Sequence, residues 1–179
     1  QAKLIVKTDM ELNKAQEELD KRIGGLDALQ QVSHLITTTL DENEIFQRLN
    51  QPLLKEIGFE KYLVLIFNNE TLYCRVNIGF SEPELQKIIA TIQGDPSLMP
   101  ILLSGQLLSS IKSFQDKRNE ILKIFATKFF VIAPITSQNK ASGILFAGNQ
   151  SDTFILTEGD EELISILADQ IGKAVENAR

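Results

Sequence analysis

Apolar residues recur at helical spacing through the first forty positions of the chain. No proline interrupts residues 4–40, and one apolar seam repeats every seven residues at Ile5, Leu12, Leu19 and Leu26. This spacing is typical of a coiled coil. The adjacent Gly24 and Gly25 lower the helix propensity by about 2 kcal/mol, so a joint or frayed region is expected there. We therefore expect a signalling helix at residues 1–25 and a domain at residues 26–179. An amphipathic helix folded onto that domain stays an alternative.

A second helix and a hairpin are predicted next. Asp41 and Glu44 have the spacing of a capping box, and the apolar stripe that follows ends at Gly58, with a kink expected at Pro52. Residues 60–67 form a continuous β-prone run, apolar over 62–67, of the type found in central strands. Residues 71–78 alternate, with Leu72, Cys74, Val76 and Ile78 on one face and Tyr73, Arg75 and Asn77 on the other.

The second half repeats the hairpin pattern after a helical middle. Residues 81–127 are predicted to form helices and irregular segments, with a short strand possible at 107–111. Strand patterns return at 129–135 and 141–148, joined by a polar turn. The last helix starts with a capping box at Thr157 and Asp160, and its apolar positions step by three and four residues. The predicted fold class is α+β.

The order of these elements resembles a GAF domain, and the carboxyl half carries the most specific match. Its residues are VIAPI at 131–135, GILFAGN at 143–149, FILTEGDEEL at 154–163 and LADQIGKAVENA at 167–178. The resemblance covers about residues 26–179. It implies a central antiparallel sheet of about six strands, terminal helices on one face, and a helical roof over a small-molecule pocket on the other face. Members of this family sense small molecules, whereas others only dimerise and relay a signal.

Composition narrows the possible partners. The chain has 179 residues, with 18 Lys and Arg against 24 Asp and Glu, and a net charge of -6. This charge has the wrong sign for a nucleic-acid partner. No apolar run reaches the ~18 residues that a membrane span needs. We expect a cytoplasmic segment of a longer signalling chain, which can itself be membrane-anchored and carry an output domain.

Few residues suggest chemistry. A single Cys and a single His exclude a disulfide framework and a Cys/His zinc site. Bilin-binding relatives attach their pigment to a cysteine that is usually accompanied by a histidine. No histidine is near Cys74 in the sequence, so a role as a small buried apolar residue fits Cys74 better. His34 has no neighbouring metal ligands. We predict no enzyme activity and no metal, and leave the identity of any cofactor open.

The basic residues of 112–128 suit either a pocket for an anionic ligand or, more commonly, a solvated helix face. The Asn-Lys-Phe-Asp-Glu set of cyclic-nucleotide-binding relatives has no counterpart in the middle segment.

Two sets of candidate functional residues follow. A ligand between sheet and roof is expected to contact polar groups on the second strand and apolar groups of the roof: Tyr73, Arg75, Asn77, Ile88, Ile101 and Phe114. An exposed edge strand explains the three polar positions equally well. A homodimer through the terminal helices is expected to use Leu12, Leu19, Leu26, Ile164, Leu167, Ile171 and Ala174. The predicted function is a sensory module that binds a small molecule and relays the signal through its terminal helices. The alternative is a ligand-free dimerisation or spacer domain.

Overall fold

The computed structural model describes residues 42–49, 58–69, 71–111, 115–151 and 156–177, with eight single positions among the first 34. These positions (12, 13, 15, 16, 27, 30, 31 and 34) are helical and exposed. The predicted joint at Gly24 and Gly25 and the predicted kink at Pro52 lie outside the described residues. So do the candidates Leu19, Leu26 and Phe114.

Five antiparallel strands form one sheet in the order β2-β1-β5-β4-β3. The sequence predicted about six strands, and the described part of the chain has five. The two predicted hairpins are confirmed, as is the short strand within the middle segment. The strands are β1 (Lys61–Asn68), β2 (Thr71–Ile78), β3 (Leu108–Ser109), β4 (Phe129–Ser137) and β5 (Lys140–Asn149).

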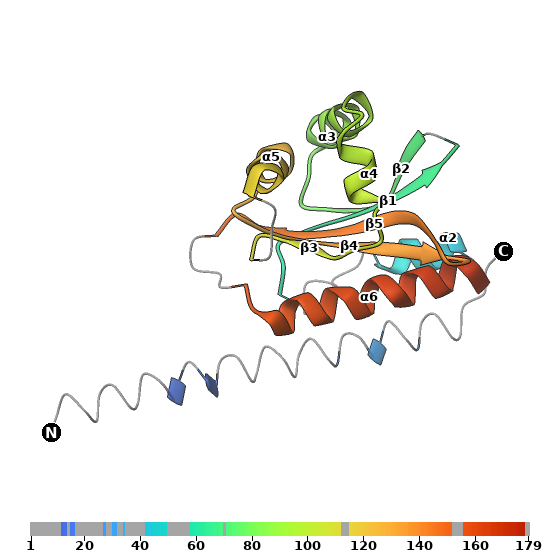
Figure 1. The fold of residues 1–179 in the computed structure, drawn as a ribbon. Helices are drawn as coiled ribbons and strands as arrows, with labels where there is room; N and C mark the ends of the chain where they lie inside the picture. The colour runs from blue at the N-terminus through green and yellow to red at the C-terminus, as the bar shows by residue number, and fades with distance from the viewer. Residues whose placement is uncertain are drawn as a thin grey trace, which may run out of the picture.

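Helices cover both faces of the sheet (Figure 1). On one face lie α2 (Glu42–Leu49) and the long α6 (Glu158–Asn177). Over the other face lie α3 (Glu82–Gly94), α4 (Leu98–Leu102) and α5 (Gln115–Phe125), which we call the roof. This arrangement confirms the predicted α+β architecture.

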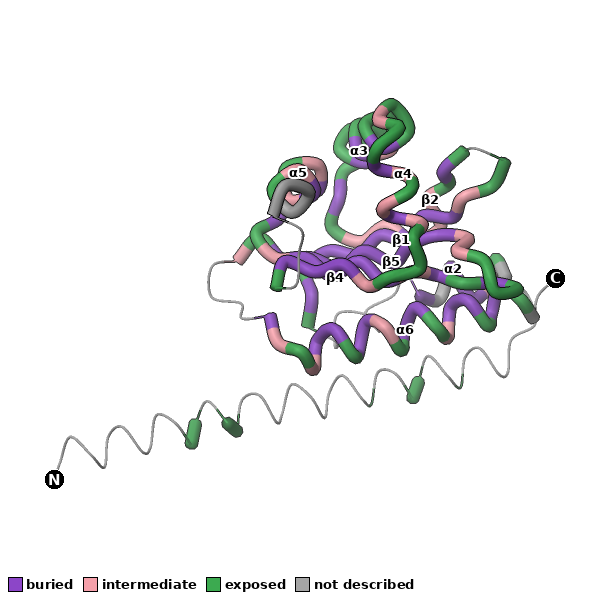
Figure 2. The backbone as a smooth tube through the Cα atoms, in the orientation of Figure 1, coloured by how far each residue is buried: buried purple, intermediate pink, exposed green. Residues whose placement is uncertain are grey.

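The sheet separates two apolar clusters because side chains alternate along its central strands. In β1, Tyr62, Val64 and Ile66 belong to the cluster beneath α2 and α6, here the helix-side cluster. Leu63 and Leu65 belong to the cluster beneath the roof, here the roof cluster. Strands β4 and β5 divide their residues in the same way, so the central strands are buried on both faces, as Figure 2 shows.

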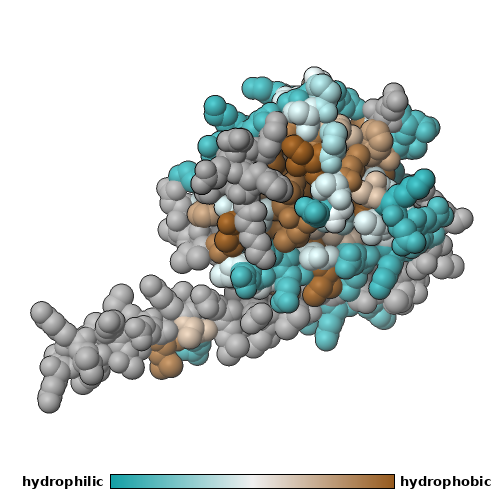
Figure 3. Space-filling view, in the orientation of Figure 1, coloured by the Kyte–Doolittle hydropathy of each residue, from teal (hydrophilic) through white to brown (hydrophobic). Residues whose placement is uncertain are grey.

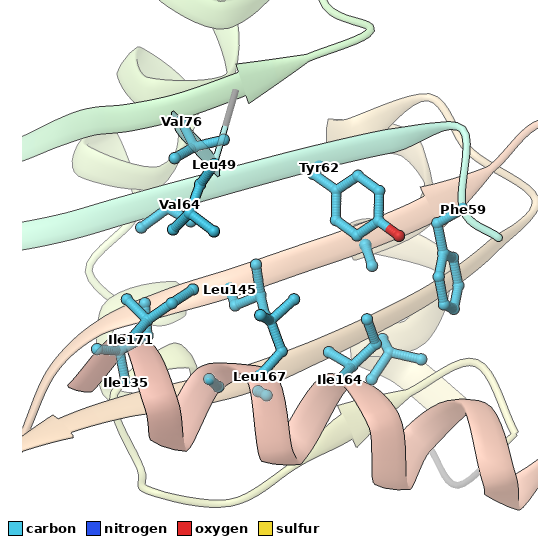
Figure 4. Close-up of a cluster of buried hydrophobic side chains, with 14 of the residues drawn as sticks. Leu49, Phe59, Tyr62, Val64, Val76, Ile135, Leu145, Ile164, Leu167 and Ile171 are labelled. Atoms are coloured by element: carbon cyan, nitrogen blue, oxygen red, sulfur yellow. The ribbon is translucent and has the colours of Figure 1, made fainter. Parts of the chain in front are cut away.

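Helix α6 is fixed to the sheet along its length. Its capping box is confirmed, because the Asp160 carboxylate accepts the Thr157 N–H at 3.0 Å and the Thr157 hydroxyl oxygen accepts the Asp160 N–H at 3.3 Å. Ile164, Leu167 and Ile171 point from the helix into the helix-side cluster (Figure 4). Further along, a Cβ built at Gly172 would overlap the Thr136 carbonyl oxygen. Only glycine therefore allows this approach of α6 to β4.

Pro134 lies in the part of β4 that pairs with β5 and no longer with β3. Strand β3 pairs only with Val131 and Ile132 of β4, so β4 has an open edge beyond that point. A proline there removes no hydrogen bond from the β3–β4 ladder.

Candidate functional site

The roof cluster is the part of the domain where apolar side chains are least completely covered. Its buried members come from the sheet and from all three roof helices. Seven more apolar side chains, from β1, β2 and the roof helices, are half-buried at its margin: Phe67, Cys74, Ile89, Met99, Ile101, Leu122 and Ile124. Among the described residues, only three flank the helix-side cluster. In Figure 3 apolar side chains reach the surface below α3, framed by polar ones. The roof side therefore offers the apolar contact area for a ligand.

The three polar candidates on β2 do not share a face, and this prediction was wrong. Val64 of β1 pairs with Val76 and the next residue, Leu65, pairs with Cys74, so Arg75 is an extra residue in β2. Such a β-bulge reverses the alternation of side chains beyond it. Tyr73 is therefore on the helix side, opposite Ile66, whereas Asn77 is on the roof side, opposite Leu63.

Arg75 contacts α2 and not the roof. Its guanidinium donates a 2.6 Å hydrogen bond to Asn43 Oδ1 and lies 4.8 Å from the centre of the Phe46 ring. Both partners belong to α2, and Phe46 is buried in the helix-side cluster. A hydrogen bond combined with a cation–π contact fixes the guanidinium in place. Arg75 thus ties β2 to the first described helix of the domain.

Asn77 closes the turn after β2. Its side-chain amide donates to the Phe80 carbonyl at 3.0 Å, and its Oδ1 accepts the Phe80 N–H at 3.3 Å. The turn contains Gly79, whose φ of 91° is a left-handed conformation that favours glycine. The amide is thus engaged in local structure on the roof side.

The remaining ligand candidates are divided between core and surface. Ile88 is buried inside the roof cluster and Ile101 is half-buried at its margin. Tyr73 is 51% exposed. A contact between any of them and a ligand stays a prediction.

Cys74 lies on the roof side as an unreactive thiol. It is half-buried, and its Sγ donates to the Val76 carbonyl at 3.3 Å. Burial raises the pKa of the Cys74 thiol to about 11, and the hydrogen bond to Val76 only partly offsets that effect. The apolar role that the sequence favoured fits this geometry.

A buried polar contact that the sequence analysis missed joins β3 to α6. The Ser109 hydroxyl donates a 2.7 Å hydrogen bond to Glu161 Oε1, and both residues are buried. Its neighbour Leu108 points the other way, into the roof cluster. No spacing rule reveals a pair that is 52 residues apart. The only signal was an acidic residue in the first turn of a helix.

The four predicted dimer residues of α6 belong to the core of the chain itself. Ile164, Leu167, Ile171 and Ala174 are at most 2% exposed and pack in the helix-side cluster. Their spacing is thus explained by packing on the sheet, and it is not a free dimer seam. The apolar side chain that α6 does expose is Ile166, at 42%, and Leu12 is 65% exposed.

Two other kinds of site can be compared with the structure. Within the described ranges, no three His, Cys, Asp or Glu residues come together to hold a metal ion. None of the helices described is long and apolar enough to cross a membrane.

The fold and the roofed apolar layer define a class, the small α+β domains that serve as sensory or regulatory modules. The family model described as "GAF domain" matches residues 41–175. The chain belongs to this family, whose members are regulatory and sensory domains of signalling proteins.

Solved structures share this fold. A crystal structure of residues 122 to 287 of a methyl-accepting chemotaxis protein has 20% identity and a TM-score of 0.58, covering 82% of this chain and 96% of that one. The phycoerythrobilin-bound GAF domain of a cyanobacterial phytochrome has 15% identity and a TM-score of 0.64, with coverages of 86% and 95%. The GAF domain of a phosphoenolpyruvate-protein phosphotransferase from Coxiella burnetii has 13% identity and a TM-score of 0.62, with coverages of 88% and 96%. A comparison with curated proteins gives no match.

Proposed function

We propose that this domain is a sensory module that binds a small molecule at the roof cluster and relays its occupancy to the terminal helices. One observation carries the proposal. At both edges of the sheet, two consecutive residues contact the roof cluster on one face and α2 or α6 on the other. The phytochrome GAF domain, which shares this fold and holds a bound phycoerythrobilin, supports a ligand role.

At the β2 edge the link passes through the bulge. Cys74 packs at the margin of the roof cluster, and the next residue, Arg75, holds Asn43 and Phe46 of α2. A displacement of β2 caused from the roof side therefore moves the guanidinium that anchors α2.

At the β3 edge the link also consists of two consecutive residues. Leu108 is a member of the roof cluster, and Ser109 holds the Glu161 carboxylate in the first turns of α6. Because this hydrogen bond is buried and its acceptor is a carboxylate, it is stronger than an exposed neutral one. A change at the roof thus reaches α6 through two residues.

A ligand drives such a relay only by binding one arrangement of these links more tightly than another. The alternative, a ligand-free spacer, is favoured by how much of the roof cluster is filled by the domain's own buried side chains. In both cases we expect a homodimer through the terminal helices, using the exposed Leu12 and Ile166, and an output domain in the parent chain.

The test begins with a thermal-shift screen of nucleotides, amino acids, organic acids and tetrapyrroles. A compound present at 100 times its dissociation constant adds about 2.7 kcal/mol of stability, or a rise of several degrees in melting temperature for a domain of this size. Hydrogen exchange is then measured with and without the compound. We expect changed protection in α2 and in the first turns of α6.

Variants separate binding from relay. Ser109→Ala and Arg75→Met should keep the thermal shift but reduce the change in α6 and α2, respectively. Ser104→Ala, at an exposed position between α4 and β3, is the matched control and should behave as the unmodified chain. A screen without any stabilising compound would favour the spacer alternative.

A further inference from the structure

Helix α6 and strand β4 meet backbone to backbone at Gly172. A Cβ built there would overlap the Thr136 carbonyl oxygen and would lie 3.4 Å from Thr136 N and C. No side chain fits between the two backbones at this point. One turn further along α6, the Glu176 carboxylate accepts the Gln138 N–H at 2.8 Å. The last turns of α6 are therefore held directly against the β4–β5 hairpin.

Large side chains separate α6 from the sheet over its first half. The rings of Tyr62 and Phe59 and the side chain of Ile164 fill the layer there, and all three are buried (Figure 4). The Glu161 carboxylate accepts the Ser109 hydroxyl of β3 at this end. Strand β3 itself pairs with β4 through only two residues. The two halves of α6 thus contact the sheet in different ways.

The glycine contact distinguishes two motions of α6 on the sheet. A slide by one turn, about 5.4 Å, would bring Ala168 or Glu176 to the Thr136 carbonyl, because residues four apart share a helix face. Either residue carries a Cβ, for which this position has no room. A rotation about Gly172 keeps the close contact and requires only that side chains repack at the other end of the helix. The contact therefore blocks the slide and permits the rotation.

We propose that α6 pivots about the contact between Gly172 and Thr136, so that a displacement of β3 swings the first half of the helix while its last turns stay on the β4–β5 hairpin. The exposed Ile166 lies in the half that swings, whereas Lys173 lies beside the pivot. The inference goes beyond the proposed function, because the pivot is a property of the fold with or without a ligand.

Distances across the sheet test the pivot. Nitroxide labels are attached through Glu162→Cys or Lys173→Cys, two exposed positions of α6, each combined with Lys87→Cys in α3. Cys74, the single native cysteine, is replaced by serine. Double electron–electron resonance then gives the distribution of each distance. Motion of the shared label at position 87 adds equally to both distributions, so their difference reports on α6.

The two distances from the pivot determine the expected result. Position 162 is ten residues from Gly172, or about 15 Å along the helix, and position 173 is one residue away, or about 1.5 Å. A rigid rotation therefore moves position 162 about ten times as far as position 173. We expect the broader distribution at 162 in the chain with native Ser109, and a further broadening there in Ser109→Ala. Ser104→Ala, at an exposed position, is the matched control and should change neither distance.

Hydrogen exchange separates a swing from local unfolding. A swinging helix keeps its own hydrogen bonds, so the protection of α6 amides relative to those of β5 should be the same in Ser109→Ala and in the unmodified chain. A loss of protection confined to the first half of α6 would mean that this half unfolds, and it would overturn the pivot.

The distance measurements can also overturn the pivot. Equal broadening at 162 and 173 would mean that the whole helix slides or lifts, and equal widths that Ser109→Ala leaves unchanged would mean that α6 does not move. If Ser109→Ala does not fold, the comparison of the two positions with native Ser109 decides alone. None of these results depends on a ligand, so the thermal-shift screen still tests the proposed function separately.

Discussion

Gly172 offers a direct test of how α6 is held on the sheet. Replacing glycine by alanine inside a helix normally stabilises the helix by up to about 1 kcal/mol. At Gly172 the added Cβ would lie closer than 3.0 Å to the Thr136 carbonyl oxygen, a backbone atom that has little freedom to yield. To make room for the methyl group, either α6 must move away from the sheet or β4 must change its position.

The cost follows from the packing of α6. The neighbouring Ala168, Ile171 and Val175 are fully buried against the sheet, so a lift opens gaps along the helix-side cluster. A gap of about 0.5–1 Å loses a quarter to a half of a contact's dispersion energy. Overpacking of this kind typically costs about 1–3 kcal/mol. After subtraction of the helix-propensity gain of about 1 kcal/mol, we expect Gly172→Ala to be less stable than the unmodified chain by up to about 2 kcal/mol.

Gly94→Ala is the matched control. Gly94 is the last residue of α3, and a Cβ built there meets nothing within 4 Å. Both variants add the same methyl group to a helix, so their difference isolates the contact with Thr136. At about 2–4 °C per kcal/mol for a chain of this size, the overpacking cost of about 1–3 kcal/mol should make Gly172→Ala melt about 2–12 °C below Gly94→Ala. Circular dichroism melts measure this, and a Gly172→Ala melting temperature equal to or above that of Gly94→Ala would refute the argument.

Three further predictions follow from the same contacts. Ser109→Ala removes a donor from the buried Glu161 carboxylate and should destabilise the chain by about 1.5–3 kcal/mol in urea unfolding; a change below about 0.5 kcal/mol would show that the pair is unimportant. Cys74, with a pKa raised to about 11, is only about 0.1% thiolate at pH 8. Iodoacetamide should label it about a hundredfold more slowly in the folded chain than in denaturant, with a rate that rises as pH approaches 11; equal rates would contradict its buried setting. Ile166→Glu should weaken a homodimer in sedimentation equilibrium and leave the melting temperature nearly unchanged, because this side chain is exposed; an unaffected dimer would place the interface elsewhere.

Local sequence patterns were sufficient to predict most of the elements. The strand at residues 71–78 was predicted with its observed bounds, and the capping box of Thr157 and Asp160 placed the start of α6. Buried central strands were predicted because apolar runs without alternation are covered on both faces. These features depend on neighbours in the chain, which the sequence displays directly.

The errors arose where the outcome depends on residues distant in the sequence. Residues 71–78 alternate without interruption, yet pairing with β1 inserts Arg75 as an extra residue and sends Asn77 to the other face. The apolar stripe of α6 was recognised, but a stripe does not say whether a sheet or a second chain covers it. The stripe also gives no reason for the glycine at position 172, which the contact with Thr136 explains.

The sheet edges, where we propose the relay, are the parts of the sheet that can move most easily. Strands β1, β5 and β4 are buried on both faces and hydrogen-bonded on both sides over most of their length, so moving any of them disrupts two clusters and two ladders at once. Among the described strands, β2 and β3 have one neighbour each, and β3 pairs through only two residues. Displacing an edge strand therefore breaks fewer contacts, and such weakly held elements are the ones expected to move when a ligand binds. Because Arg75 and Ser109 project from these two strands to α2 and α6, the segments that move most easily are also the ones that hold the terminal helices.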